Sequence, residues 1–304
     1  MNLFLSTTIY GIELGLCYAI AALGMHIAYS ILDFPDLTAD GSFPLGGVVG
    51  TIALRVFGMH PVLSLAFGML SGMAAGLCTG FLHVKFNVTK LLSGIIVMTA
   101  LLSITLALTK ALTGTGFTVA NFSYIANKVN GMFNTGNHVC GASVKIAVLL
   151  AAVLVVKFLL DGFFATRAGL VLKAVGCNES LITSLGLDIG KCKMFGLSLA
   201  NGLVGLSGCL YAQLTANYDN SCGSGKVVLT LASVIMGLSL FSGIRFLKPT
   251  TCVIFGGVLY SLCLNYFTLI DSNGIYLKLL NAVGFVLILL FNNYFKKRIR
   301  SLGA

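Results

Sequence analysis

The sequence predicts an all-α protein, a polytopic membrane helix bundle with about nine membrane segments. The mean hydropathy is +0.98 and only 9% of the 304 residues are charged, whereas soluble domains ordinarily carry about 25% charged residues. Uncharged stretches of about 20 residues recur along the whole chain, and each is long enough to cross about 30 Å of hydrocarbon as a helix. We therefore expect a single transmembrane domain over residues 1–304.

The expected segments are apolar stretches bounded by Gly, Pro, Asn or charged residues. They cover residues 3–30, 43–58, 61–84, 88–113, 141–163, 188–216, 225–244, 250–270 and 275–295. The first stretch lacks the basic n-region of a signal peptide, contains Glu13 and runs past signal-peptide length. It is therefore expected to be a retained membrane segment.

The basic residues predict the orientation of the chain in the membrane. The formal net charge is +10, and 13 of the 19 Lys and Arg fall on the same side as the basic tail at 296–300. Basic residues collect on the cytoplasmic side of membrane proteins, so this charge indicates topology and not nucleic-acid binding. Nine segments with a cytoplasmic C-terminus place the N-terminus outside.

Small residues at helical spacing predict close contacts between helices. One set lies in the first segment and another in the third: Gly11, Gly15, Ala19 and Ala22, and Gly68, Gly72, Gly76 and Gly80. Steps of three or four residues place each set on one helix face, where two backbones can approach closely in lipid.

No motif for catalysis or metal binding is recognisable. The chain lacks H-E-x-x-H and G-x-S-x-G, and its nine cysteines form no C-x-x-C pair, so we expect no enzymatic activity, metal site or cofactor. Residues 186–192 approach a phosphate loop, but they have one residue too few between the glycines and Cys192 in place of Ser or Thr. We interpret them as a helix boundary, so that any ATP–Mg must be bound by a partner. A disulfide between Cys140 and Cys222, in predicted outside loops, is a further hypothesis.

The connector between the first two segments carries an unusual concentration of acids and prolines. They are Asp33, Asp36 and Asp40, with Pro35 and Pro44. A surface turn would explain this composition, since Asp, Pro and Gly are common turn residues. A broken or re-entrant segment that lines a cavity would explain it too, and Ser42 would then cap the second segment. We expect residues 36–42, including Thr38, to line a translocation pathway.

Polar groups inside the segments are further pathway candidates. Glu13 is an ionisable group in an otherwise uncharged segment. It is expected to face a polar interior or a partner, to lie near the outer interface, or to be protonated and bonded to a neighbouring helix. Asn201, Gln213 and Asn265 lie in later segments. Such amides more often join helices than contact ligands, but Asn201 is retained as a pathway candidate.

Residues 165–191 form a basic connector with its own character. It contains Arg167, Lys173 and Lys191, a short amphipathic stretch, and glycines towards both ends. A solvated loop with an interfacial helix would look like this. A rigid helix framed by turns, which a membrane domain needs in order to dock into a groove on a soluble motor, would look the same.

Two motifs carry a resemblance to a known family. The motif T-R-x-G-L-x-L-K-A-V-G-x-N-E-x-L-I-x-x-L-G-L-D at 166–188, followed by a Gly- and Ser-rich segment, resembles the coupling segment of ABC-importer permeases of the branched-chain amino acid and ribose type. The opening G-L-C-Y-A-I-A-A-L-G-M-H-I-A-Y-S-I-L-D-F-P-D-L-T-A-D-G-S-F-P-L-G-G looks like the branch labelled tryptophan/tyrosine-type. The similarity extends over about residues 10–290. Cys177, at a position that is often polar, and the long loop at 114–141 depart from the pattern.

The resemblance implies a multi-pass permease of the bacterial cytoplasmic (inner) membrane that imports a small organic solute such as an amino acid. It implies ABC ATPase subunits, an extracytoplasmic substrate-binding lipoprotein, a second permease copy in a homodimer and surrounding membrane lipid, and no nucleic acid. The runner-up hypothesis is a proton- or sodium-coupled secondary transporter that uses Glu13 and the acids at 33–40 as an ion relay.

Carried over to this chain, the resemblance predicts a coupling helix over residues 174–187. Asn178 and Glu179 would form its exposed turn, and Gly186 would close it. The residues assigned to ATPase coupling are Arg167, Gly169, Ala174, Gly176, Asn178, Glu179 and Gly186.

Overall fold

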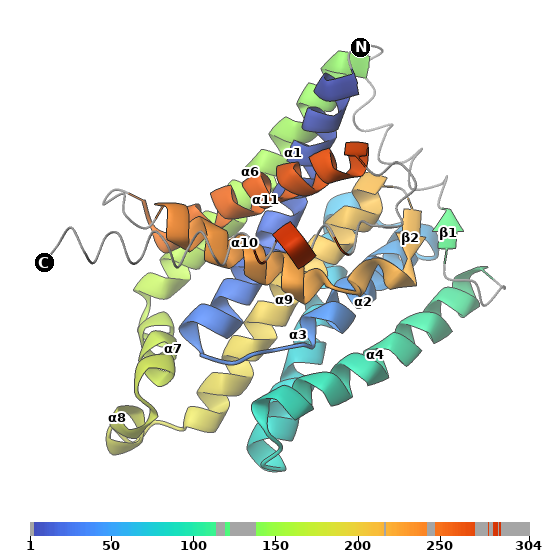
Figure 1. Ribbon diagram of the computed structural model, residues 1–304. Coiled ribbons are helices and arrows are strands. Elements are labelled where there is room, and N and C mark those ends of the chain that lie inside the picture. Colours follow the sequence, from blue (N-terminus) through green and yellow to red (C-terminus); the bar gives the residue numbers. More distant parts are fainter. Residues whose placement is uncertain are drawn as a thin grey trace, which may run out of the picture.

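The computed structural model describes residues 3–113, 119–121, 138–215, 217–241 and 247–270, and the single positions 279, 282–284 and 286. These residues form a helix bundle with one short pair of strands (Figure 1). The elements are α1 (Leu3–Met25), the π-helix η1 (His26–Ile31), α2 (Ala39–Arg55), α3 (Pro61–Lys85), α4 (Lys90–Thr113), β1 (Val119–Asn121), α6 (His138–Ala165), α7 (Arg167–Cys177), α8 (Glu179–Ser184), α9 (Ile189–Thr215), β2 (Asn217–Asp219), the 3₁₀ helix η2 (Asn220–Gly223), α10 (Lys226–Phe241) and α11 (Pro249–Ile270).

Six helices in the described part of the chain are long and apolar enough to cross a membrane. The predicted segments at 43–58 and 225–244 correspond to α2 and α10, which have only 17 and 16 residues. The predicted segment at 275–295 lies outside the described residues except for the single positions given above. The described helices therefore establish a polytopic bundle but do not reach a count of nine full-length spans.

The core of the bundle is built around α1 and α9. Within an apolar stretch of 18 residues in each long helix, 83% of the residues are buried in the helix that α1 and η1 form, and 72% are buried in α9. The corresponding fractions are 17% in α6 and 28% in α4. α9 runs through the middle of the bundle, while α4 lies along its edge (Figure 1). In a membrane, the apolar faces of α4 and α6 would contact lipid or other subunits, because they bury little within this chain.

The small-residue stripes make the predicted close helix contacts. A Cβ atom placed on Gly15 would lie 2.9 Å from the Cα atom of Val258 in α11, and one on Gly80 would lie 2.8 Å from the Cα atom of Met194 in α9. Gly72 and Gly76 of α3 face the backbone of α9 at Asn201 and Leu197. Glycine at these positions lets the helices pack backbone to backbone, which confirms the interpretation of both stripes.

The strand pair was not predicted from the sequence. β1 and β2 are antiparallel, with Ala120 opposite Tyr218. Each has three residues, too few for an alternating pattern to stand out from a loop. β1 follows α4 and β2 follows α9, and the pair lies away from α7 and α8 (Figure 1). The side chain of Cys140 is not among those that the structure describes. The predicted disulfide with Cys222 therefore lies outside the described residues and stays a prediction.

Candidate functional site

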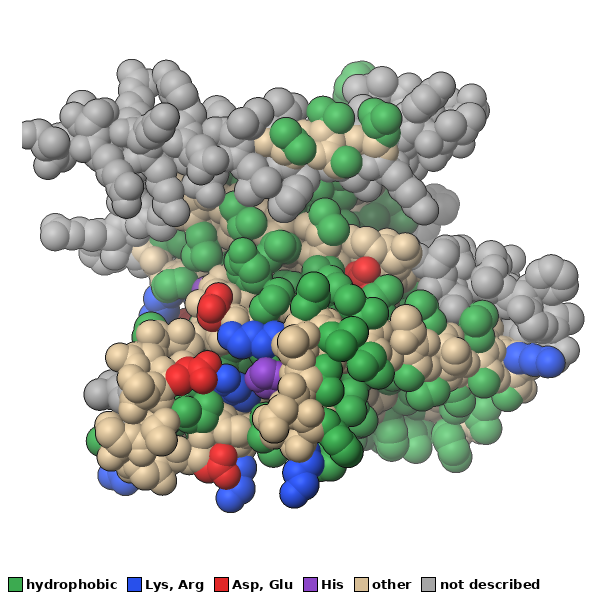
Figure 2. Space-filling view, turned by 60° about the horizontal axis from the view of Figure 1, so that its bottom comes forward, with side chains coloured by type: hydrophobic (Ala, Val, Ile, Leu, Met, Phe, Trp, Pro, Cys, Tyr) green, Lys and Arg blue, Asp and Glu red, His purple; other side chains and the backbone are tan. Residues whose placement is uncertain are grey.

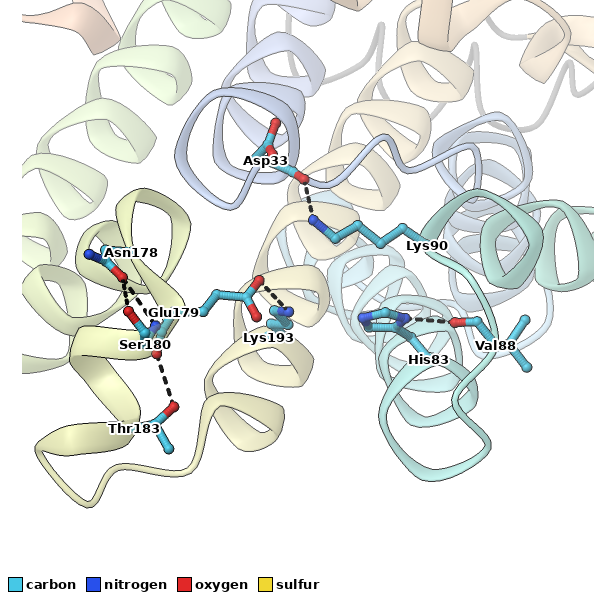
Figure 3. Close-up of polar contacts among 9 residues, drawn as sticks. All are labelled: Asp33, His83, Val88, Lys90, Asn178, Glu179, Ser180, Thr183 and Lys193. Atoms are coloured by element: carbon cyan, nitrogen blue, oxygen red, sulfur yellow. Dashed lines mark hydrogen bonds and ion pairs between the residues drawn. The ribbon is translucent and has the colours of Figure 1, made fainter.

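The chain leaves helical geometry between α1 and α2. α1 continues as the π-helix η1, and Leu32 and Phe34 then bond back to the carbonyl groups of Ile27 and Ala28. Asp33 has a φ of 50°, a left-handed conformation that aspartate tolerates better than most residues. The ammonium group of Lys90 donates to the Asp33 carbonyl over 2.9 Å (Figure 3). The break is therefore fixed by its own backbone bonds and by the start of α4.

The break places the side chain of Asp36 in the protein interior. Asp36 is 1% exposed, and its Oδ1 accepts a hydrogen bond from the Thr38 backbone N–H over 2.9 Å. Its Oδ2 accepts from Nδ2 of Asn201 in α9 over 2.6 Å. A surface turn does not bury its carboxylate in this way, so the surface-turn alternative is wrong for Asp36.

Five buried polar side chains around this contact form what we call the polar cluster: Asp36, Thr38, Ser42, Thr79 and Asn201. The Ser42 hydroxyl donates to Oδ1 of Asn201 over 2.8 Å, and the hydroxyls of Thr38 and Thr79 are 2.7 Å apart. Buried polar groups need such partners because each unsatisfied group costs about 1–3 kcal/mol. The polar cluster joins α2, α3 and α9 at the break.

The expectation that Ser42 caps the second segment is wrong. α2 begins at Ala39, with Thr38 at the N-cap position and without a side-chain cap bond. Ser42 lies one turn inside the helix and its hydroxyl is turned towards Asn201. The expectation took the segment to begin at residue 43, whereas α2 begins four residues earlier, at Ala39.

Asp40 and Glu13 lie apart from the polar cluster. The Asp40 carboxylate accepts from the backbone N–H groups of Val227 over 2.7 Å and Gly225 over 3.1 Å, so it caps the N-terminus of α10. Glu13 is 9% exposed and lies in the first half of α1, where Lys145 of α6 interacts with it electrostatically. At 1.5 Å per residue, the rest of α1 alone places Glu13 about 18 Å from the break.

Sequence analysis missed a cation held among aromatic rings beside Asp40. Nζ of Lys226 donates to the Tyr18 hydroxyl over 2.8 Å and lies 4.2 Å from the centre of that ring. It also lies 5.3 Å from the ring centres of Phe43 and Tyr211. The rings come from α1, α2 and α9, so no local sequence pattern could have revealed them.

The predicted coupling helix at 174–187 is two helices and not one. Thr166 caps α7 by accepting from the Gly169 N–H over 3.4 Å, and α7 ends at Cys177. Asn178 is extended, and its side chain accepts from the Ser180 N–H and hydroxyl over 3.1 and 2.6 Å to start α8 (Figure 3). Asparagine readily takes this capping role, which explains why the helix breaks there.

Glu179 is not a free acid at an exposed turn. Its carboxylate lies 2.7 Å from Nζ of Lys193 in α9, although 49% of its side chain is exposed (Figure 3). The hydrogen bond from Lys193 lowers the pKa of Glu179 below its usual value. Lys193 lies inside α9, within the predicted segment at 188–216, and is only 7% exposed. This ion pair joins α8 to the second turn of α9.

The glycines of the connector have two different roles. Gly169 and Gly176 allow close approach: a Cβ on Gly169 would overlap the backbone at Phe163, and one on Gly176 would overlap the carbonyl of Ile31. Gly186 instead has a φ of +73° with open space around it, so it makes a turn that L-residues resist. Through Gly176, α7 packs directly on η1, five residues before Asp36.

Charged residues gather around the connector. Figure 2 views the bundle from the end that carries α7, α8 and the turn between α3 and α4, and basic, acidic and histidine side chains lie together on this face. Arg167 is exposed on α7, Ala174 is half-buried, and Nδ1 of His83 bonds the Val88 carbonyl over 2.7 Å at the α3–α4 turn. This end of the bundle is therefore polar enough to meet a soluble partner.

The comparisons with known proteins decide the family. Residues 7–291 match the family model described as branched-chain amino acid transport system / permease component. The chain belongs to this family. It is the membrane permease subunit of an ABC importer, a multi-pass protein of the bacterial inner membrane and not an enzyme, and its partners are an ABC ATPase and a substrate-binding component. The family match does not favour the secondary-transporter hypothesis.

Its relatives include permeases for several solutes. A tyrosine transport system permease protein of Clostridioides difficile is 38% identical over 91% of this chain and 88% of its own length. A probable branched-chain amino acid transport permease protein LivH of Methanocaldococcus jannaschii is 28% identical over 73% of this chain and 70% of its own length. The ribose import permease protein RbsC of Escherichia coli K12 is 23% identical over 90% of this chain and 82% of its own length. No solved structure matches the chain.

Proposed function

We propose that this permease imports an amino acid and works as a homodimer around a central pathway. The support for the substrate class is the 38% identity to a permease named for tyrosine transport, together with the named branched-chain amino acid permease. In this proposal the binding component is an extracytoplasmic lipoprotein, and ATP–Mg is bound by the ATPase, so the permease itself needs no cofactor.

The proposal includes about nine membrane segments in a single domain over residues 1–304. α2 and α10 would serve as short segments in the interior, where neighbouring helices cover them, and the stretch at 275–295 would supply the last. Most of α2 is buried, in keeping with a segment that crosses protein more than lipid.

The proposed pathway runs beside the polar cluster, and Glu13 and Asp40 would line it at other depths. Support comes from the carboxylate of Asp36, which is buried at a helix break and bound to Asn201 over 2.6 Å. Non-helical backbone at membrane depth is tolerated where it is buried in protein or lines a cavity. Polar groups at such a break can exchange their internal hydrogen bonds for a solute.

The single observation that carries the coupling part of the proposal is a continuous set of contacts. Glu179 of α8 binds Lys193 over 2.7 Å, and Asn201, two turns further along α9, binds Asp36. Residues 193 and 201 lie on the same helix, about 2.2 turns apart. A push on the coupling segment, residues 165–191, by the ATPase would therefore move the helix that holds the polar cluster.

Uptake into proteoliposomes tests the function. The permease is reconstituted with its ATPase and binding protein, and uptake of labelled tyrosine, leucine and ribose is measured with ATP inside. We expect uptake of an amino acid that vanadate stops. Uptake that needs no ATP, or that favours ribose over both amino acids, would contradict the proposal.

Labelling tests the pathway. In a variant without the nine native cysteines, Ser42→Cys is expected to react with a small thiol reagent to different extents in nucleotide-free and ATP-bound complexes. Ser71→Cys, at a half-buried position of α3 where the hydroxyl bonds only its own helix, serves as the matched control. Equal labelling of position 42 in both states would remove the polar cluster from the pathway.

A further inference from the structure

The ammonium group of Lys226 is a positive charge at membrane depth. It donates to the Tyr18 hydroxyl over 2.8 Å, and Tyr18 lies near the middle of the stretch Phe4–Ile31, which is long and apolar enough to cross a membrane. Lys226 belongs to none of the ion pairs found in the described part of the chain. Charged side chains at such depth are costly and mark functional sites, so the position of this lysine needs an explanation.

Three aromatic rings surround the ammonium group, and we call them the aromatic cage: Tyr18, Phe43 and Tyr211. Nζ of Lys226 lies 4.2 Å from the ring centre of Tyr18 and 5.3 Å from those of Phe43 and Tyr211. The three ring centres are themselves only 5.5–6.2 Å apart. Ring faces attract a cation, most strongly where water is excluded. The charge therefore holds the first residue of α10 against α1, α2 and α9 at once.

The residues beside Lys226 hold the first turn of α2. We call residues 223–227 the α10 start. The backbone N–H groups of Gly225 and Val227 donate to the Asp40 carboxylate over 3.1 and 2.7 Å. Gly223 packs so closely that a Cβ atom on it would overlap the Asp40 carbonyl. The α10 start therefore contacts α2 through its backbone as well as through its side chains.

The α10 start and the polar cluster hold roughly opposite faces of this turn. Thr38 and Ser42 bond to Thr79 and Asn201 in the polar cluster. Asp40 and Phe43 contact the α10 start instead. At 3.6 residues per turn, positions 38 and 42 lie on one face and positions 40 and 43 on the other. A displacement of the α10 start would therefore move the turn that carries Ser42.

The α10 start also leads to the far end of the bundle. It follows β2 and η2 directly in the chain, and β2 lies at the end away from α7 and α8 (Figure 1). In the proposed function the ATPase acts at α7 and α8, so the binding component docks at the opposite end. A continuous set of contacts thus runs from that end through Lys226 to the polar cluster.

We propose that Lys226 is a positioning residue for transport. Held in the aromatic cage, it keeps the α10 start against α2, so that docking of the loaded binding component is transmitted to the polar cluster. The inference rests on the proposed function, because it takes the polar cluster to line the pathway. It adds a second input to that cluster, independent of the coupling segment.

ATP hydrolysis by the reconstituted complex tests this role. Hydrolysis is measured with and without the binding component, which is loaded from a mixture of the common amino acids. Lys226→Met keeps a long apolar side chain and removes the charge, and we expect the ratio of the two rates to fall at least fivefold. Lys226→Arg, which keeps a cation for the aromatic cage, is expected to retain more than half of the parent ratio.

Lys157→Met is the matched control. Lys157 also lies over a ring, 5.0 Å from the centre of Phe158, but it belongs to α6 and not to the residues that hold α2. Its ratio of rates is expected to equal that of the parent. A ratio in Lys226→Met that equals the parent ratio would overturn the proposal. So would an equal fall in Lys157→Met, which would indicate a general effect of losing a lysine.

Labelling of Ser42→Cys in the variant without native cysteines gives the second readout. The loaded binding component is expected to change this labelling, and Lys226→Met is expected to reduce the change at least fivefold. A change of equal size with and without Lys226→Met would overturn the role of Lys226 and leave the proposed pathway intact. Labelling that the binding component does not alter even with Lys226 present would overturn the proposed transmission to the polar cluster.

Discussion

Asp36 and Asn201 depend on each other at the scale of single residues. A buried carboxylate without a cation partner is stabilised by the hydrogen bonds that it accepts, and Asp36 accepts them from Asn201 and from the Thr38 backbone. Asn201 is in turn held by the Leu197 carbonyl, to which it donates over 3.1 Å. Removing Asn201 therefore leaves the buried carboxyl group of Asp36 with only the donor from the Thr38 backbone.

Asn201→Ala is expected to lower stability by about 2 kcal/mol or more, because it leaves Asp36 short of a donor and Ser42 without an acceptor. Thermal unfolding of the solubilised chain measures this as a fall of roughly 5 °C in Tm. Asn265→Ala is the matched control, since that amide donates within its own helix to Ser261. Equal falls in Tm in the two variants would show that the contact with Asp36 stabilises the fold no more than the bond that Asn265 makes within its own helix.

Gly186→Val is expected to impair coupling by straining the backbone. At a φ of +73° an L-residue costs about 1–2 kcal/mol, and no atom lies close enough to add a clash. Asn tolerates this conformation, so Gly186→Asn should retain most activity. The measurement is substrate-stimulated ATP hydrolysis of the assembled complex. Equal losses of activity in the Asn and Val variants would indicate that the size of the side chain against a partner decides the effect and that the backbone conformation does not.

At the scale of elements, the sequence predicted the long helices and the stripes that pack them. Hydropathy and small-residue spacing are local patterns of the sequence. They therefore predict a helix and its packing face without knowledge of the tertiary structure. The π-helix η1, the strand pair and the break at Asn178 each depend on a few local hydrogen bonds. Residue types alone do not reveal such bonds. The partners of Asp36 and Lys226 lie on helices that are distant in the sequence. The sequence pattern of one segment does not determine how these helices are rotated relative to one another.

Gly72→Ala is expected to push α3 away from α9, because its Cβ would overlap the backbone carbonyl of Asn201. Overpacking of this kind typically costs about 1–3 kcal/mol. Gly162→Ala on α6 has no atom within 4 Å of the new Cβ and should be neutral or slightly stabilising, since alanine favours helix. Comparison of the two Tm values tests the stripe. A harmless Gly72→Ala would mean that α3 and α9 can separate freely.

The attachment of α8 to α9 is expected to weaken in acid. Lys193 lowers the pKa of Glu179 in the folded chain, so the ion pair stabilises α8 above the usual glutamate pKa. This stabilisation is lost as the pH falls through the lowered folded value. Hydrogen exchange of the amides at 179–184, corrected for intrinsic rates, should therefore rise in acid. Glu179→Gln should remove that rise, whereas Asp188→Asn, in an exposed pair with Lys191, should preserve it.

At the scale of the whole molecule, α9 connects the end of the bundle that carries α7 and α8 to the middle of the bundle. The coupling segment is linked to the break by two routes, directly through Gly176 on η1 and indirectly through α9, where Glu179 binds Lys193 and Asn201 binds Asp36. The motif at 166–188 located this segment in the sequence. It did not reveal that Glu179 bonds within the chain, because the phase of α8 relative to α9 is set by the turn at Gly186. The role of Glu179 towards the ATPase must therefore be separated from its role inside the permease.

A charge swap separates the two roles. Glu179→Lys places two ammonium groups together, and we expect at least a tenfold loss of substrate-stimulated ATP hydrolysis. The double variant Glu179→Lys with Lys193→Glu restores opposite charges at the 2.7 Å contact while still presenting a lysine to the ATPase. If the internal ion pair sets the position of the coupling segment, the double variant recovers much of the lost activity, and the two changes are strongly non-additive.

The exposed pair of Asp188 and Lys191, 3.5 Å apart, provides the control swap. Exposed pairs contribute little, so Asp188→Lys with Lys191→Asp should hydrolyse ATP like the parent complex, and so should each single variant. A Glu179/Lys193 double variant as defective as Glu179→Lys alone would contradict the internal role. In that case the ATPase itself must read the charge at position 179, and co-purification of the complex should fall in parallel with hydrolysis.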